Sequence, residues 1–356
     1  MIDTITLLKE LVFAPGPPGQ EELVAVVVED HAKSLGCPVK RDPRGNVIIG
    51  LPGADAIPEH ADIVVTAHLD EIALMVESAE PDGKLKVVPM GGLLPWKWGE
   101  GPVSVLATGG AIPGILGFGS IHTNSPESAA VKARERPLSW DGARVFTGLS
   151  VHALNEQGVR PGTRVVLGQD RRIVTQFSDF IASPFLDDRA DLTALILTLE
   201  AIKQRGSSQD VFPGKSVVFA ATAAEEVGGH GALALFRRMT PEIAIALEIG
   251  PRVPESPFTL DAKPTVWVND GYSAMLGSDI DLMSRVVSES GIDVHWQALS
   301  RGGSDATCAA SHGLVDRPFT LAFAAENSHG YEITHKNSIG QLSKLLLALL
   351  DTLAGG

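Results

Sequence analysis

The sequence predicts an α/β protein in which helices enclose a mostly parallel or mixed sheet, with a small all-β insert. Three observations lead to this fold class. Near-continuous apolar runs such as "DIVVTAH", "KSVVFAAT" and "PEIAIAL" are typical of strands buried on both faces. Segments with a helical pattern alternate with these runs, which indicates a parallel sheet. Between residues 73 and 165 the sequence pattern changes to short β-type runs broken by Gly and Pro.

The N-terminal part is expected to contain two helices and two strands. Residues 3–13 form an amphipathic pattern that ends at Pro15, and a second helix is expected from about 19 to 35, where Gly36 stops it. The run "NVIIG" is a short strand between turns. "ADIVVTAHLD" is then a core strand that ends on ionisable residues.

The remaining chain divides into an insert and a second α/β part. We expect residues 73–165 to form a barrel-like β domain, and residues 1–72 with 166–356 to form one discontinuous catalytic domain. Within the insert, the polar stretch 121–142 is the one candidate for a disordered loop. After the insert come a helix from about 188, three further buried strands and a closing helix in "SIGQLSKLLLALLDTLAG".

Composition excludes several classes of partner. The chain has 356 residues, 44% of them hydrophobic, and a net charge of −14. An acidic surface argues against nucleic acid and anionic membranes as partners, because both favour Lys and Arg. The two cysteines, Cys37 and Cys308, predict reduced thiols in a cytoplasmic protein. No signal peptide or apolar run of about 18 residues is recognisable, so no transmembrane helix is expected.

Ionisable residues follow several of the predicted core strands. These residues are His68 with Asp70, the pair Glu225 and Glu226, Glu248, and His329 before Glu332, while Asp187 and Asp188 open a helix. In open α/β sheets, ligands bind outside the carboxyl ends of the strands. We therefore expect these side chains to meet at one edge of the sheet.

Two imidazoles and several carboxylates suit two divalent ions such as Zn²⁺, Co²⁺ or Mn²⁺. Each residue also has a structural interpretation. A single histidine at a strand end is usually a hydrogen-bonded core residue, and Asp187 and Asp188 could cap a helix. Adjacent Glu225 and Glu226, however, repel each other after a core strand unless a cation or proton separates them, and an unpaired Glu248 is costly to bury.

The motifs "AHLDEIALMV", "FLDDRAD", "AEEVGGHGA" and "GGSDA" before "SHGYE" resemble the dinuclear metallo-aminopeptidases of peptidase family M42. The resemblance runs along nearly the whole chain. It implies a zinc-peptidase-like catalytic domain and a PDZ-like insert that mediates dimerisation. It also implies a homo-oligomer, a dimer or a dodecamer built from dimers, that acts on peptide substrates.

The same resemblance implies a role for each site residue. His68 and Glu248 would complete the shell of one metal and Glu226 and His329 that of the other, while Asp187, rather than Asp188, would bridge the two. Glu225 would be the general base, and Asp70 would orient His68. The family usually has Asp at the position of Glu248, and the residues before His329 also depart from its pattern.

The expected reaction is metal-dependent removal of N-terminal residues from peptides, with Zn²⁺ foremost and Co²⁺ or Mn²⁺ as alternatives. A dinuclear amide hydrolase acting on acylated amino acids would use nearly the same ligands. A glycosidase would need two carboxylates and no metal, and a non-catalytic assembly protein is a further interpretation.

Several other residues receive plainer expectations. Arg189 is expected to pair with Asp187 or Asp188, and Glu71 to hydrogen-bond within the surroundings of the metal ligands. His122 is interpreted either as structural or as reaching a partner subunit. Trp96 and Trp98 are expected in the core of the insert or at an interface that it forms, with the core preferred.

Overall fold

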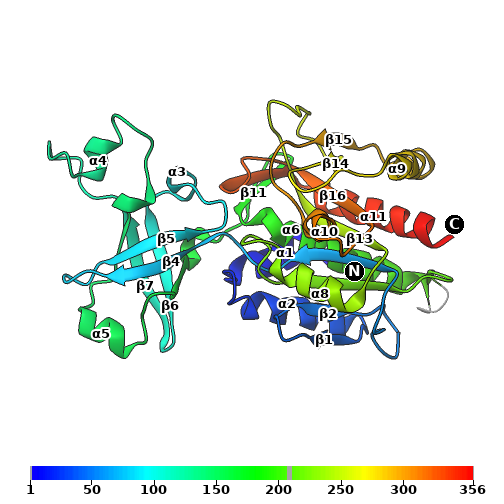
Figure 1. Cartoon of the computed structure of the whole chain (residues 1–356), viewed down its shortest axis with the longest axis horizontal. Coiled ribbons are helices and arrows are strands. Elements are labelled where there is room, and N and C mark those ends of the chain that lie inside the picture. Colours follow the sequence, from blue (N-terminus) through cyan, green and yellow to red (C-terminus); the bar gives the residue numbers. More distant parts are fainter. Residues whose placement is uncertain (1, 207–210, 356) are drawn as a thin grey trace.

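The computed structural model describes residues 2–206 and 211–355. Figure 1 shows a large lobe built on a long sheet and a smaller lobe formed by a β-barrel. The helices are α1 (Thr4–Phe13), α2 (Glu22–Ser34), α3 (Pro95–Trp98), α4 (Ala129–Lys132), α5 (Val151–Glu156), α6 (Leu186–Arg205), α8 (His230–Met239), α9 (Gly277–Ser290), α10 (Asp305–Ser311) and α11 (Ser338–Gly355).

The large lobe contains a mixed sheet of 11 strands. Its strands are β1 (Val39–Arg41), β2 (Val47–Ile49), β3 (Ile63–His68), β10 (Thr175–Phe177), β11 (Phe180–Pro184), β12 (Val217–Thr222), β13 (Ile243–Pro251), β14 (Pro264–Asn269), β15 (His295–Ala298), β16 (Arg317–Glu326) and β17 (Tyr331–His335). The centre of the sheet runs β12-β3-β13-β16 with parallel pairing. Beside it, β2, β14 and β17 pair antiparallel with the central strands, and β15 pairs parallel with β14. The predicted mixed α/β sheet is thereby confirmed.

Both faces of the central strands are buried, which explains their continuous apolar sequences. In β3, Ile63 and Val65 belong to a core that includes α1, α2, α6 and α11, whereas Val64 faces a second core with α8 and α10. Successive strand residues point to opposite faces. A strand between two helix layers therefore needs mostly apolar residues at both alternations.

The small lobe is a closed barrel of six antiparallel strands, in the order β4-β5-β8-β7-β6-β9. These strands are β4 (Ala73–Ala79), β5 (Leu85–Met90), β6 (Gly101–Ala107), β7 (Gly110–Gly117), β8 (Arg144–Phe146) and β9 (Arg164–Leu167). The barrel has its own hydrophobic core, separate from the two cores of the large lobe. The predicted barrel-like insert is confirmed.

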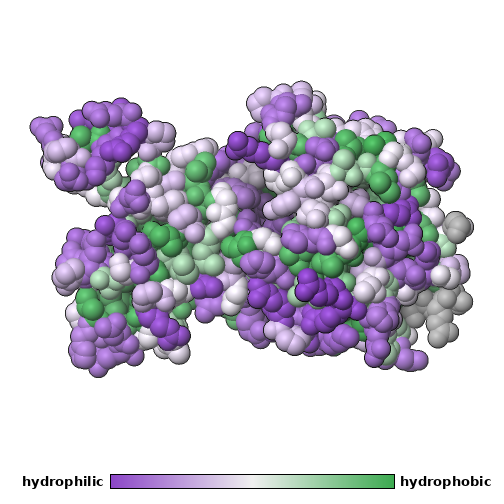
Figure 2. All heavy atoms as spheres, viewed as in Figure 1, coloured by the Kyte–Doolittle hydropathy of each residue, from purple (hydrophilic) through white to green (hydrophobic). Residues whose placement is uncertain are grey.

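Two local expectations for the insert need correction. Residues 121–142, expected as a disordered loop, include the short helix α4, which lies in a mostly hydrophilic projection at the outer end of the barrel lobe (Figure 2). Trp98 is buried as expected, but Trp96 is 61% exposed. The two side chains lie on different sides of the one-turn helix α3, so only one of them can reach the barrel core.

Among the described residues, no helix has the length and apolar character that crossing a membrane requires.

Candidate metal centre

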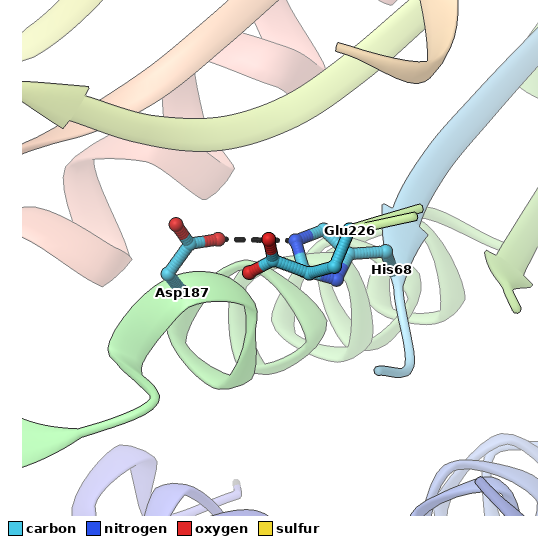
Figure 3. Close-up of side chains that lie close together, drawn as sticks. All are labelled: His68, Asp187 and Glu226. Carbon is cyan, nitrogen blue, oxygen red and sulfur yellow. Dashed lines mark hydrogen bonds and ion pairs between the residues drawn. The ribbon is translucent and has the colours of Figure 1, made fainter. Parts of the chain in front are cut away.

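His68 is the last residue of the central strand β3, and its side chain is almost completely buried. Its ring Nδ1 lies 3.1 Å from the backbone carbonyl oxygen of Asp70, and its Nε2 lies 3.0 Å from Oδ1 of Asp187. The contact at Nδ1 fixes the plane of the ring and directs Nε2 toward the start of α6 (Figure 3). A histidine held in this way presents one nitrogen to a metal ion.

The carboxylate of Asp70 holds the segment that follows β12. Its Oδ1 accepts the backbone N–H of Glu225 at 2.8 Å, and its Oδ2 accepts that of Glu226 at 3.1 Å. The same Oδ1 lies 3.4 Å from Nδ1 of His68. Asp70 is fully buried, so it connects the ring of His68 with both glutamates and does not itself reach the cavity.

Asp187 and Asp188 lie at the beginning of α6, and their environments differ. Asp187 points into the cavity, where its two oxygens approach His68 at 3.0 Å and Nε2 of His329 at 3.5 Å. Asp188 instead accepts the backbone N–H of His68. This difference agrees with the choice of Asp187 over Asp188 as a candidate ligand.

Glu225 and Glu226 follow β12 and line the same cavity. Oε1 of Glu226 lies 3.7 Å from Nε2 of His329. The carboxylate of Glu225 makes no hydrogen bond or ion pair with the residues that the structure describes, so it is available to a water molecule or a substrate. Glu248, in the middle of β13, is buried with its carboxylate at the same cavity.

His329 lies in the turn between β16 and β17, and the barrel lobe contacts its ring. Nδ1 is 2.9 Å from the carbonyl oxygen of Gly92, in the segment that follows β5. Its backbone N–H donates to Oε1 of Glu332 at 2.9 Å, and Oε2 of Glu332 accepts the N–H of Asp187 at 2.9 Å. Glu332 therefore ties two of the candidate ligands together, a role that the sequence did not indicate.

The structure thus brings all seven predicted site residues together. Two groups of three side chains have ligand atoms within 4.8 Å of one another: His68, Asp187 and Glu226, and His68, Glu225 and Glu248. Figure 3 shows the first group, whose side chains approach one another from β3, the start of α6 and the turn after β12. Whether each residue binds metal or carries out chemistry remains a prediction.

Burial, and to a lesser degree the neighbouring acids, disfavour the charged forms of the carboxylates in the site. Burial raises the pKa of Glu226 to about 7 and the pKa values of Glu225 and Glu248 well above their usual range. The carboxylate of Glu226 in turn raises the pKa of His329 to about 11. Within the described part of the chain, no Lys or Arg forms an ion pair with Asp187, Glu225, Glu226 or Glu248.

Clustered buried carboxylates need protons or cations to offset their repulsion. The mixture of imidazole nitrogens and carboxylate oxygens matches the donors that Zn²⁺, Co²⁺ and Mn²⁺ accept. The residues present therefore fit a site for divalent metal ions.

Two expectations for nearby residues are wrong. Arg189 does not pair with Asp187 or Asp188; its Nη2 lies 2.7 Å from Oε2 of Glu71. Glu71 also receives two hydrogen bonds from Arg172, at 2.6 and 2.7 Å, and does not contact the candidate ligands. Arg172 and Arg189 are both buried, so their positive charges need an anion beside them, and Glu71 serves both.

The cavity has a volume of about 580 Å³, which is enough for a few amino-acid residues. Beside the acidic residues, its wall includes Trp267, Tyr272, Leu299, Arg301 and Cys308. Cys308 is buried in α10, as expected, and burial raises the pKa of its thiol to about 11. His122 is exposed in the insert and is not part of this site.

The sequence model of the M42 glutamyl aminopeptidase family matches residues 45–345. A lysyl aminopeptidase of Pyrococcus furiosus is 32% identical over 246 residues, which cover 68% of this chain and 65% of that protein. A TET aminopeptidase from the archaeon Thaumarchaeota archaeon SCGC AB-539-E09 has a TM-score of 0.85 at 20% identity, covering 98% of this chain and 96% of that one.

The TET1 peptidase of Pyrococcus horikoshii, which can assemble into a tetrahedron or a large octahedral shell, has a TM-score of 0.80 at 24% identity. The alignment covers 98% of this chain and 99% of that one. At these identities, the two solved structures establish a shared fold.

Proposed function

The chain belongs to the M42 glutamyl aminopeptidase family, and on this basis we propose that it is a two-metal aminopeptidase that removes N-terminal residues from peptides. The observation that carries the proposal is the convergence of His68, Asp187, Glu226 and Glu248 around one cavity, with the unpaired carboxylate of Glu225 in its wall. The family membership supports the assignment as a peptidase. The residues that line the cavity support the presence of metal ions and of a general base.

We propose His68, Asp187 and Glu248 as the ligands of one ion, and Asp187, Glu226 and His329 as those of the other. Bound divalent ions supply Lewis acidity, which lowers the pKa of a water molecule and polarises a peptide carbonyl. Zn²⁺ is the first candidate, with Co²⁺ and Mn²⁺ next. Glu248 takes the position where the family usually has Asp, so its longer side chain changes the reach of that ligand.

Glu225 acts as the general base in this proposal. It accepts a proton from the attacking water and returns it to the departing amine, which completes the cleavage of the C–N bond. Asp70 keeps Glu225 and Glu226 in place through their backbone N–H groups. The acidic wall of the cavity favours a protonated substrate amine, which selects for a free N-terminus.

We further propose that the barrel, with boundaries near residues 73 and 165, is a separate PDZ-like domain that mediates dimerisation, and that dimers assemble further, up to a dodecamer. The Pyrococcus horikoshii relative, which can form a tetrahedron or an octahedral shell, supports this proposal. Buried free Cys37 and Cys308 agree with a cytoplasmic location. Light scattering on the purified protein measures the size of the assembly.

The decisive experiment compares substrates that differ only at the amine. Aminoacyl-nitroanilides with a free amine should be cleaved, whereas the same compounds with an acetylated amine should not. Activity should vanish with a chelator and return with Zn²⁺, Co²⁺ or Mn²⁺. Preferential release of acyl groups from acyl amino acids would assign the protein to the deacylases, and activity that withstands complete metal removal would reject the two-metal proposal.

A further inference from the structure

The barrel lobe contacts the turn that carries His329, at residues 327–330, which we name the ligand turn. From α3, Nζ of Lys97 donates to Oδ1 of Asn327 at 2.6 Å and to the carbonyl oxygen of Ser328 at 3.0 Å. The carbonyl oxygen of Gly92 lies 2.9 Å from Nδ1 of His329. Three hydrogen bonds thus join the insert to a four-residue turn that is more than 200 positions away in the sequence.

The ligand turn has an unfavourable backbone conformation. Asn327 and His329 have φ values of 67° and 59°, a left-handed region that side-chain-bearing residues adopt at a cost. Two hydrogen bonds join the ligand turn to β17, which follows it. Nδ2 of Asn327 donates to the carbonyl oxygen of Tyr331, and the N–H of His329 donates to Oε1 of Glu332. Such a turn keeps its shape only when the contacts around it are sufficient.

The helix that carries Lys97 provides a fixed base. Pro95 and Trp98 of α3 are buried, and Trp98 packs edge-on against Trp140 with 6.4 Å between the ring centres. The ammonium of Lys97 also lies 5.1 Å from the centre of the Trp96 ring. Lys97 is therefore anchored on the barrel core and does not extend freely into solvent.

The glycines before α3 make the approach close. A Cβ atom at Gly92 would lie 3.0 Å from Nδ1 of His329, and one at Gly91 would lie 3.1 Å from Oε2 of Glu226. Both distances are shorter than ordinary van der Waals contact. The insert thus packs directly against two candidate ligands of the same proposed ion.

From these contacts we infer that Lys97 is a positioning residue for His329, and that the insert thereby sets the affinity of one of the two metal ions. This inference rests on the proposed two-metal function. Residues that hold metal ligands in place typically change metal affinity about 10- to 100-fold when they are mutated. If Lys97 positions His329, its removal should weaken metal binding. If Lys97 acted only through its charge, its removal should strengthen metal binding, because a nearby cation repels a divalent cation.

The test is a titration of the metal-free protein with zinc. The binding of each ion is measured by calorimetry or by competition with a chelating indicator. Lys97→Met, which keeps the aliphatic stem but loses both hydrogen bonds, should weaken one ion about tenfold or more and leave the other unchanged. The weakened ion should be the one that His329→Ala loses. Lys97→Arg, which can donate to both acceptors, should recover most of the affinity.

Lys86→Met serves as the matched control, since Lys86 is also in the insert and, among the described residues, forms an ion pair only with exposed Glu77. Gly92→Ala places a methyl group against the ring of His329 and should weaken the binding of the same ion. This variant provides a second test if Lys97→Met is poorly folded. Unchanged or tighter binding of both ions to Lys97→Met would overturn the inference, as would equal weakening of both. Wild-type protein that binds fewer than two zinc ions would overturn the proposed function itself.

Discussion

Asp70 accepts the backbone N–H of Glu225 at 2.8 Å from within the protein interior. The proposed base is thus placed by a carboxylate that does not line the cavity. In Asp70→Asn, an amide N–H₂ would face one of the two backbone N–H groups, so one hydrogen bond would be lost. We expect turnover to fall about 10- to 100-fold with the fold retained. Steady-state kinetics beside circular dichroism checks this, and full activity in the variant would contradict it.

Glu225→Gln removes the proton acceptor and keeps the shape of the side chain. We expect turnover to fall about 10²- to 10⁴-fold, while the protein still binds both ions, because Glu225 is not among the five proposed ligands. Kinetics and elemental analysis of the same preparation test both statements. The exposed Glu127 of the insert supplies a control substitution, Glu127→Gln, that should leave both quantities unchanged.

Asp187→Ala should abolish the binding of both ions, because Asp187 is the one carboxylate proposed to bind each of them. Its oxygens approach both His68 and His329. Metal content measured by elemental analysis after dialysis should fall to near zero, whereas Glu248→Ala should affect mainly one ion. Retention of two ions by Asp187→Ala would rule out the bridging role.

The ion pairs of Glu71 predict an effect on stability. Glu71, Arg172 and Arg189 are buried together, so Glu71→Gln leaves two arginines without an anion. We expect the free energy of unfolding to fall by about 3–5 kcal/mol, measured by urea denaturation. Glu77→Gln, which breaks an exposed pair with Lys86, should cost at most about 1 kcal/mol. Equal losses in the two variants would contradict the burial argument.

The stability of the metal-free protein should depend on pH with a definite sign. Burial raises the pKa of Asp191 to about 7, that of Asp305 to about 6 and that of Glu332 to about 8, against 3.8, 3.8 and 4.5 for the free side chains. The folded state therefore binds more protons than the unfolded state in this range, and stability must fall as pH rises. We expect a decrease from about pH 4.5 to about pH 8.

Urea denaturation at a series of pH values measures this decrease. Saturating zinc should raise the stability at pH 8, because binding to the folded state alone shifts the unfolding equilibrium. A metal-free protein that becomes more stable between pH 5 and 8 would show that the buried acids are not protonated in the folded state.

The sequence predicted the central sheet because strands covered on both faces leave a signal that is local in the chain. The run before His68 is apolar at both alternations apart from Thr66, so the first ionisable residue marks the strand end. The same logic placed Glu225 and Glu226 after β12, and parallel pairing of β3 with β12 puts their ends at one edge. Convergence of the site residues could thus be predicted from the sequence.

The contacts that sequence reasoning missed join residues far apart in the chain. Glu71 and Arg172 are 101 positions apart, and nothing near Glu71 in the sequence indicates a cationic partner. The same holds for Arg189, whose neighbours in the sequence offer nearer acids than its true partner. Lys97 gave no signal at all, because a lysine on a one-turn helix looks like any exposed residue until the barrel is placed beside the ligand turn.

The order of the site residues along the chain has a consequence for biosynthesis. His68 emerges from the ribosome early, but His329 and the strand β16 that leads to it follow all the other candidate ligands. β16 pairs with β13 in the middle of the sheet, so the sheet that carries Glu248 is incomplete until β16 has been made. A prematurely terminated chain that stops before His329 lacks one of the proposed ligands and cannot assemble the full set of donors.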